Sequence, residues 1–414
     1  MLVKIELENF FSIRDRICID FRAGNTKTAL SRKLADNVIE WNGLKLLKSI
    51  GLFGANASGK SNILKAINFC CHMVLESHQH NENSVFNYAP FKFGDYKNKP
   101  SNFLIDFICD DVEYEYSFSL LQSKIISESL FHYPNDRRAR VFEREGSEYK
   151  FAESVLARPN DVALNTSDKN LFLSRASSMN RELAQKLYRY FLSTFMLGLI
   201  PLHDMNVESY FDTNKALILA ALQQCDSDIC DVAKKIETIP VPIPNPGNPF
   251  GMPTRVVNQE MVRFLTYHKI APDVPFDMDE ESGGTKRLFS ILLRMIDVVK
   301  NKKSVMLDEF DTSLHASISE FLLDLIHASS QSQLLFSSHN LSLINMNRFR
   351  KDQIVFVTKN ETGATEVQSL YDYKDFRENM DAEKAYRQGR FDAIPIVTST
   401  VESLKRMLAE GVNS

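Results

Sequence analysis

Residues 54–61 read GANASGKS and match the pattern G-x-x-x-x-G-K-[ST], which restricts the fold of this chain more than any other segment. An apolar run at 45–53 precedes the motif, and apolar side chains recur at helical spacing from Ile63 to Val74 behind it. A glycine-rich loop between a buried strand and a helix directs backbone N–H groups and the positive helix end toward phosphates. We predict that a nucleotide is bound there by the following residues: Gly54, Asn56, Ser58, Gly59, Lys60, Ser61 and Asn62.

Two carboxylates and a histidine follow later apolar runs. The run VMLDE ends in Asp308 and Glu309, and the run LFSSH ends in His339. We predict that Asp308 and the Ser61 hydroxyl hold Mg²⁺, while Lys60 contacts the β- and γ-phosphates. Glu309 is predicted to orient or deprotonate the attacking water, and His339 to donate to the γ-phosphate. An acidic turn or a lone histidine is ordinary by itself, but the order of the motifs favours catalytic roles for Lys60, Glu309 and His339.

A second glycine-containing segment begins another predicted helix. Ser282, Gly283 and Gly284 precede an apolar helical stripe that runs from Leu288 to Val299. Free N–H groups and a hydroxyl at a helix N-terminus form an anion site. Because one nucleotide does not need two phosphate clamps from one chain, we predict that this clamp closes on the γ-phosphate held by another protomer. Two ATP molecules would then be sandwiched in a head-to-tail homodimer or higher oligomer; the alternative is a plain helix cap.

Taken together, these segments resemble the ABC-class ATPases of the RecF, SMC and OLD branch. GANASGKSN resembles that branch's phosphate loop, ESGGTKRL its signature motif, VMLDEFDTSLH its Walker B segment with the D-loop residue Asp311, and FSSHN its switch histidine. The run YRQGRFDAIP at 386–395 resembles the tail of RloA-type AAA ATPases of bacterial phage-defence loci. The resemblance implies ATP and Mg²⁺ as cofactors, a nucleotide contact by Asp311, and hydrolysis of ATP to ADP and phosphate.

The order of predicted strands and helices favours an α/β fold with an ABC-type ATPase core. We expect a mixed core sheet that carries the phosphate loop, an antiparallel β lobe near the amino end, and a helical insertion between the two halves of the ATPase. The predicted domains are an N-terminal lobe at 1–160, the insertion at 161–275, and a C-terminal lobe at 276–414 with the signature, the carboxylates, the histidine and the tail.

The insertion is predicted to hold helices at 183–197 and 215–235. These helices would serve either as an arm for oligomerisation or partner docking, or as a lid that packs on the chain's own core. The run PVPIPNPGNPFGMP at 240–253 is too rich in proline for a helix or a central strand, so a linker or loop is predicted there.

The charge balance bears on binding partners. The chain has 49 basic and 53 acidic side chains, and a net charge of −4 argues against coating nucleic acid by bulk charge. Arg137, Arg138, Arg140 and Arg144 form a local basic cluster that either contacts DNA or protects the edge of a hairpin. The acidic opening segment, the lack of a long apolar run and the scattered cysteines predict a cytoplasmic protein that does not enter a membrane.

Other acidic clusters lack the companions of a metal site. We therefore predict solvated surface at Asp226 with Asp228, at the carboxylates within 277–281, and at the pair His203–Asp204.

Only 75 residues follow His339, too few for the Toprim nuclease domain of OLD proteins, so we expect a separately encoded effector. The leading hypothesis is a sensor and regulator in anti-phage defence that controls such a toxic partner. The alternatives are a RecF-like DNA repair or recombination ATPase that binds duplex DNA, and a nucleotide-gated scaffold that hardly turns over.

Overall fold

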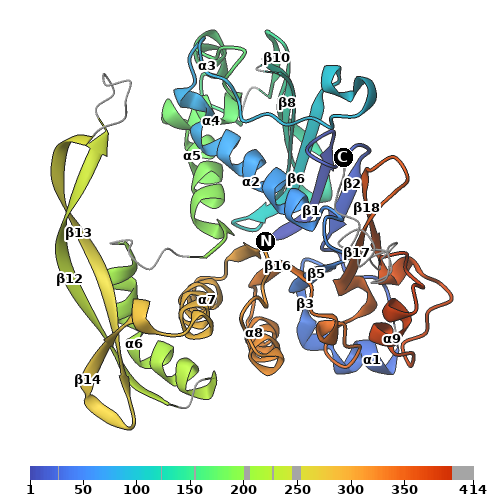
Figure 1. The fold of residues 1–414 in the computed structure, drawn as a ribbon. Helices are drawn as coiled ribbons and strands as arrows, with labels where there is room; N and C mark the ends of the chain where they lie inside the picture. The colour runs from blue at the N-terminus through green and yellow to red at the C-terminus, as the bar shows by residue number, and fades with distance from the viewer. Residues whose placement is uncertain are drawn as a thin grey trace, which may run out of the picture.

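A computed structural model describes residues 1–26, 28–122, 124–152, 155–199, 206–225, 228–244 and 253–393. Two large β-sheets lie side by side, and a long β hairpin with its own short third strand lies at one side of them (Figure 1). Within the described residues, no helix combines the length and the apolarity needed to cross a bilayer. The predicted α/β class is confirmed by this arrangement.

The mixed sheet carries six strands in the order β11-β15-β16-β5-β17-β18. These strands are β11 (Phe195–Leu197), β15 (Ser304–Leu307), β16 (Gln333–Ser338), β5 (Ser49–Phe53), β17 (Ile354–Lys359) and β18 (Thr365–Ser369). All neighbours are parallel except β17 and β18. The three central strands β15, β16 and β5 are buried along their whole length, as expected for parallel strands covered on both faces.

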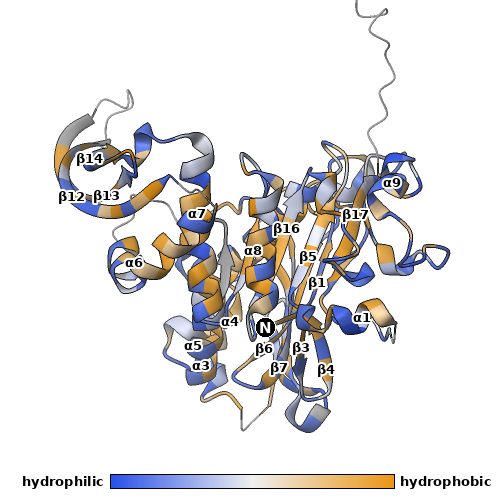
Figure 2. Cartoon of the chain, turned by 90° about the horizontal axis from the view of Figure 1, so that it is seen from below, coloured by the Kyte–Doolittle hydropathy of each residue, from blue (hydrophilic) through white to orange (hydrophobic). Residues whose placement is uncertain are grey.

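Helices cover this sheet and connect its strands. The main ones are α2 (Lys60–Glu76), α7 (Gly283–Lys300) and α8 (Ala316–Ala328). Hydrophobic residues recur along α7, α8 and the strands β16 and β5, with hydrophilic residues between them on the helices (Figure 2). The predicted helices behind the phosphate motif and behind the signature segment are therefore confirmed.

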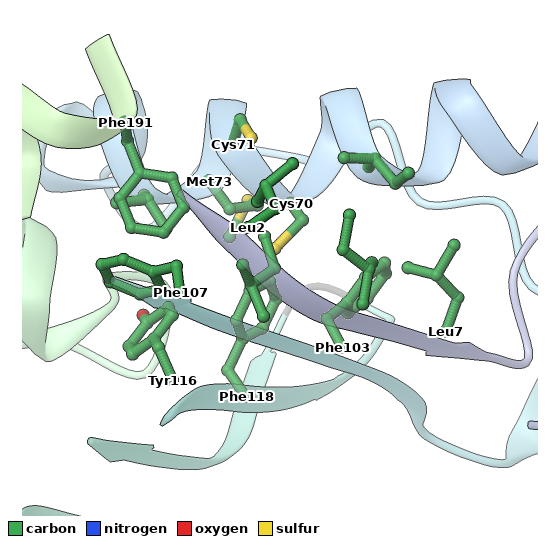
Figure 3. Close-up of a cluster of buried hydrophobic side chains, with 14 of the residues drawn as sticks. Leu2, Leu7, Cys70, Cys71, Met73, Phe103, Phe107, Tyr116, Phe118 and Phe191 are labelled. Carbon is green, nitrogen blue, oxygen red and sulfur yellow. The ribbon is translucent and has the colours of Figure 1, made fainter. Parts of the chain in front are cut away.

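The second sheet is antiparallel, in the order β10-β9-β8-β7-β6-β1-β2. Its strands are β10 (Glu148–Phe151), β9 (Ala139–Glu145), β8 (Lys124–His132), β7 (Val112–Leu121), β6 (Ser101–Cys109), β1 (Leu2–Glu8) and β2 (Ile17–Asp20). Alternate side chains along β6 and β7 meet α2, so that Cys70 and Met73 of the helix lie over Phe103 and Phe107 (Figure 3). The predicted antiparallel β lobe is confirmed.

A buried glutamine joins the two sheets. The Gln333 side chain on β16 donates to the carbonyl of Leu2 at 3.0 Å and of Leu47 at 3.2 Å. Its oxygen accepts from the backbone N–H of Leu2 and from the Ser304 hydroxyl. A buried amide with every polar atom paired contributes stability, whereas an unpaired one costs it. Gln333 therefore fixes β1 of the antiparallel lobe against the strand that leads to His339.

The antiparallel lobe also holds a carboxyl that opposes folding at neutral pH. Asp106 on β6 is only 6% exposed, and its Oδ1 has no hydrogen-bond partner among the described residues. Burial, and then the neighbouring Glu113 carboxylate, raise the pKa of Asp106 to about 7. Because the folded state keeps this proton where the unfolded state has lost it, the free energy of unfolding falls as pH rises from about 4 to about 7.

We expect Asp106→Asn to raise the free energy of unfolding by about 1–3 kcal/mol at pH 8, since it removes the charge at constant volume. At pH 4.5 the wild-type carboxyl is already protonated in the folded state, so the two proteins should unfold alike. Urea titrations at both pH values measure this, with Asp111→Asn, an exposed position on the same hairpin, as control. Equal stabilities at pH 8 would contradict the expectation.

The insertion at 161–275 is only half helical. Its helices are α3 (Pro159–Leu164), α4 (Phe172–Ser178), α5 (Glu182–Arg189), a π-helical turn at Tyr190–Thr194, and α6 (Asn206–Cys225). The helix predicted at 183–197 stops at Thr194, and residues 195–197 join the mixed sheet as β11. The helix predicted at 215–235 ends at Cys225, and a long strand follows it, so both boundaries were wrong.

The rest of the insertion is a β arm, which we define as β12 (Ile229–Pro244), β13 (Pro253–His268) and β14 (Ala271–Asp277). The linker predicted at 240–253 was wrong over Pro240–Pro244, which belongs to β12; residues 245–252 lie outside the described residues. Prolines occupy every second position, 240, 242 and 244, so their missing N–H groups all face the same edge. Because β12 is an edge strand, that edge needs no donors, and the pairing with β13 continues.

Smaller elements complete the chain. They are α1 (Ala29–Lys33), β3 (Val38–Trp41), β4 (Leu44–Leu47) and α9 (Ala382–Arg387). The tail resemblance at 386–395 begins within α9, and its last two residues lie outside the described residues.

Candidate nucleotide-binding site

The phosphate loop follows β5, and two of its glycines are required by close contacts. Gly59 has φ of +117°, and a Cβ there would lie 2.0 Å from the hydroxyl oxygen of Thr365. A Cβ at Gly54 would lie 2.1 Å from the carbonyl oxygen of Val357. Thr365 also donates to the carbonyl of Ser58 at 2.9 Å. The loop is thus packed directly on β17 and β18, with Asn56 and Ala57 exposed at its tip.

Lys60 is folded over the loop that precedes it. Its ammonium donates to the carbonyls of Gly54 at 2.8 Å and Ala55 at 3.0 Å, and the residue is only 4% exposed. Burial lowers the pKa of Lys60 to about 8, against the opposing effect of Asp308, Glu309 and Asp311. The ammonium is therefore held against the backbone of the phosphate loop, where a charged donor suits phosphate oxygens.

Ser61 and Asp308 meet, although 247 residues separate them. The Ser61 hydroxyl donates to Asp308 Oδ1 at 3.2 Å, and the Ser337 hydroxyl donates to the same oxygen. Ser337 also accepts from the backbone N–H of Glu309 at 2.8 Å. A hydroxyl and a carboxylate are hard oxygen donors of the kind Mg²⁺ prefers, so the residues present fit the predicted cation.

Three neighbouring parallel strands explain this convergence. The phosphate loop follows β5, His339 follows β16, and Asp308 and Glu309 follow β15. Carboxyl ends of parallel strands meet at one edge of a sheet, the usual place for a ligand. Glu309 takes a left-handed conformation (φ +48°) and accepts from the Thr312 hydroxyl at 3.2 Å.

His339 is exposed at this edge and lies within electrostatic reach of the other groups. Partial burial and then the Lys60 ammonium lower the pKa of His339, whereas Asp311, Glu309 and Asp308 act to raise it. The structure therefore brings together the predicted lysine, carboxylates, D-loop aspartate and histidine at one edge.

Asn62 is hydrogen-bonded within the protein. Its side-chain amide donates to the Ser12 hydroxyl at 2.8 Å, and Ser12 is hydrogen-bonded to Thr365 at 2.7 Å. The backbone N–H of Thr365 also donates to the Ser12 carbonyl at 2.7 Å. Asn62 thus fastens the start of α2 to the turn between β1 and β2 and to β18, on the supporting side of the phosphate loop.

The signature segment begins α7. Ser282 is the N-cap, and its hydroxyl accepts from the backbone N–H of Thr285 at 3.1 Å. Ser282 and Gly283 are exposed, whereas a Cβ at Gly284 would lie 2.9 Å from the carbonyl oxygen of Ser313. The exposed hydroxyl and glycine face solvent, as a surface that closes on a second molecule requires.

Sequence reasoning missed Arg287, which links this helix to the carboxylates. Its guanidinium donates to the backbone carbonyls of Glu309 at 2.9 Å and Asp308 at 3.2 Å. Burial lowers the pKa of Arg287, an effect opposed by the nearby carboxylates. Its place within the quoted signature letters ESGGTKRL was the available signal. Ser337, which lies within the quoted FSSHN, and Thr365 were missed too, because a serine or threonine in a strand does not by itself indicate a supporting role.

Three of the four arginines considered for DNA binding make hydrogen bonds or ion pairs within the protein. Arg144 is 2% exposed and donates to three backbone carbonyls, those of Gly146, Asn170 and Ser167. Arg138 pairs with Glu115 at 2.7 Å and covers the Phe131 ring, and Arg140 pairs with Glu143 at 3.0 Å. The alternative of a protected hairpin edge is not met by Arg140 and Arg144 either, because their strand β9 is paired on both sides, with β8 and β10.

A comparison with protein families finds a match over the segment that carries the candidate site. The sequence profile of a protein family described as "AAA domain, putative AbiEii toxin, Type IV TA system" matches residues 49–345, from β5 and the phosphate loop to beyond the switch histidine. The chain belongs to this AAA domain family. As a member of it, the chain carries an ATPase-type nucleotide site built on an α/β sheet. A search of curated proteins finds no match.

A comparison with solved structures finds three SMC heads with low sequence identity and TM-scores below 0.5. An SMC head bound to the C-terminal winged-helix domain of ScpA has 17% identity and a TM-score of 0.42, covering 93% of this chain and 99% of that one. The SMC head domain from Thermotoga maritima has 14% identity and a TM-score of 0.40, covering 89% and 98%. An SMC head from Pyrococcus furiosus with an extended coiled coil, bound to the C-terminal domain of ScpA, has 15% identity and a TM-score of 0.40, covering 94% and 98%.

Proposed function

We propose that this protein is a Mg²⁺-dependent ATPase that dimerises head to tail around two ATP molecules. The observation that carries the proposal is the contact between Ser61 of the phosphate loop and Asp308 of the carboxylate loop. The exposed Ser282 and Gly283 at the start of α7 support the second half of the site. Membership of the AAA domain family supports the nucleotide.

Each residue has a role set by its position. The loop N–H groups and the Lys60 ammonium bind and orient the β- and γ-phosphates. Ser61 and Asp308 would hold Mg²⁺, which supplies charge neutralisation at the transferring phosphoryl group when bound. Glu309 takes a proton from, or orients, the attacking water, and His339 donates to a γ-phosphate oxygen. Ser282 and Gly283 of the second protomer complete the enclosure and exclude water.

In the cell, we infer that this ATPase acts as a sensor and regulator in anti-phage defence that controls a separate toxic effector, such as a Toprim-type nuclease. The description of the matching family names a toxin of a type IV toxin–antitoxin system, which supports a role in a defence locus. Affinity capture of the tagged protein from its native host, with and without ATP, tests this. Recovery of a nuclease or toxin in a nucleotide-dependent manner is expected, and recovery of DNA repair factors alone would contradict it.

The dimer is tested by substituting the exposed signature serine. We expect Ser282→Arg to abolish ATP-dependent dimerisation, measured by light scattering, because the guanidinium fills the space of the second protomer's γ-phosphate. Affinity of the monomer for ATP should stay unchanged, since Ser282 lies outside the phosphate loop. Ser178→Arg, at an exposed position at the end of α4, is the matched control. A dimer that forms equally well with Ser282→Arg would contradict the sandwich.

A further inference from the structure

The signature loop follows directly from the β arm. After β14 ends at Asp277, only the 3₁₀ turn Met278–Glu280 and Glu281 separate the arm from Ser282. Asp277 caps that turn and pairs with Arg263 of β13 at 3.0 Å. The backbone at the signature serine is therefore placed by the base of the arm.

Glu281 connects the β arm to the signature loop directly. It was predicted to be solvated, and the structure shows that this was wrong. Its side chain is 10% exposed and accepts from the Thr266 hydroxyl and from Nε2 of His268 at 2.8 Å, both on β13. The carboxylate that immediately precedes the signature serine is thus bound by the middle strand of the arm. Replacing His268 removes one of the two hydrogen bonds that Glu281 accepts from the arm and leaves the one from Thr266.

His268 sits between two carboxylates. Its Nδ1 lies 3.0 Å from Asp228 Oδ2, on the segment before β12, and its Nε2 contacts Glu281, before α7. From β14, the uncharged Phe276 ring packs edge-on at 5.1 Å. Since an ionised carboxylate only accepts hydrogen bonds, both contacts are satisfied together by the doubly protonated imidazolium. Although burial opposes it, hydrogen bonds to Glu281 and Asp228 raise the pKa of His268.

Apolar packing supports the same connection. Phe264 of β13 lies between Phe211 of α6, at 4.9 Å, and Phe289 of α7, at 5.0 Å between ring centroids. These three rings are buried and anchor the arm's base on the signature helix two turns behind Ser282. Figure 1 shows α6 and the arm together beside α7. The polar contact at Glu281 and the aromatic contact at Phe289 thus hold the first part of α7 at two points.

We propose that Glu281 and His268 form a clamp that sets the position of Ser282 and Gly283, so that the β arm and the signature loop move as one unit during ATP-dependent closure. This inference rests on the proposed ATP-sandwich dimer. Glu281 and His268 are positioning residues, because they act on the second protomer's nucleotide only through the loop. As pH rises and the imidazolium loses a proton, one of the two carboxylate contacts is lost and the clamp opens.

The clamp is tested with His268→Gln, Glu281→Gln and the double variant. We expect each single variant to need about tenfold more ATP for half-maximal dimerisation, the scale of one charged hydrogen bond. The double variant should need no more than the worse single one, because both remove the same contact. ATP affinity of the monomer should not change. His72→Gln and Glu82→Gln, at exposed positions elsewhere, are the matched controls.

Two further measurements separate the clamp from a general structural effect. Dimerisation of the wild-type protein should weaken more steeply than that of His268→Gln as pH rises above the ordinary histidine range, because the titration of Lys60 is common to both proteins. Without nucleotide, amide hydrogen exchange at 283–287 should be faster in both single variants. If the wild-type protein does not dimerise with ATP, the proposed function is wrong. If it dimerises, and the variants match it in ATP dependence and amide exchange, the clamp is wrong.

Discussion

Turnover of ATP is expected to fall by about 10²- to 10³-fold when Glu309 is replaced by glutamine, the scale of losing a positioned general base. Glutamine keeps the volume and the polar oxygen but does not take a proton from water. The groups that hold the nucleotide are left in place, because Ser337 contacts the backbone of Glu309 rather than its carboxylate. Asp308 and Ser61 also keep their mutual contact. ATP binding and ATP-dependent dimerisation should therefore persist in this variant.

Phosphate release under saturating ATP measures the turnover, and fluorescence of a labelled ATP analogue measures binding. Glu361→Gln, at an exposed position in the turn before β18, is the control and should behave as wild type. Similar turnover in wild type and Glu309→Gln would contradict the role of Glu309 and favour a nucleotide-gated scaffold that hardly hydrolyses ATP. Loss of binding and of assembly in Glu309→Gln would contradict the proposed dimer.

Replacement of Lys60 with alanine should weaken ATP binding by about 30- to 100-fold. The lysine is 4% exposed and its ammonium already lies over the loop carbonyls, so little side-chain freedom remains to be lost when phosphate binds. Charge-assisted hydrogen bonds of this kind contribute about 2–3 kcal/mol, which corresponds to that change in affinity. Isothermal titration with ATP and Mg²⁺ measures it.

Lys65→Ala is the matched control, since Lys65 is an exposed lysine on the same helix α2. It should bind ATP as the wild type does. Thermal unfolding of Lys60→Ala should remain cooperative, because the loop is fixed by Thr365 and the close contacts of Gly54 and Gly59 rather than by the lysine. An affinity within threefold of wild type would show that nucleotide binds elsewhere.

The local parts of the fold could be predicted from the sequence. The motif at 54–61 and the helix behind it depend on residues close together in the chain, and the structure has them where expected. The meeting of Ser61 with Asp308 could also be anticipated. It follows from strand order in a parallel sheet, because each motif ends a buried strand.

The β arm could not be predicted in this way. Each proline within 240–244 removes a backbone N–H donor, but whether this prevents strand pairing depends on whether the strand lies at the edge of a sheet. The position of a strand in its sheet is set by tertiary structure, not by the local run of residues. The same reason explains the error at Glu281: an acidic residue among acidic residues is predicted to be solvated, yet Thr266 and His268 of another strand bury it.

The sequence by itself was enough to predict the groups at the candidate site: the phosphate loop, the carboxylates, the switch histidine and the signature serine. Each belongs to a short motif whose chemistry is carried by adjacent residues. Tertiary structure decided what supports them: Thr365 behind Gly59, Ser337 beneath Asp308, Arg287 on the carboxylate loop and His268 on Glu281. These supports lie from 13 residues to about 300 residues away from the groups they hold. Side chains so distant in sequence become neighbours only when strands pair and helices pack, and no local pattern records that pairing.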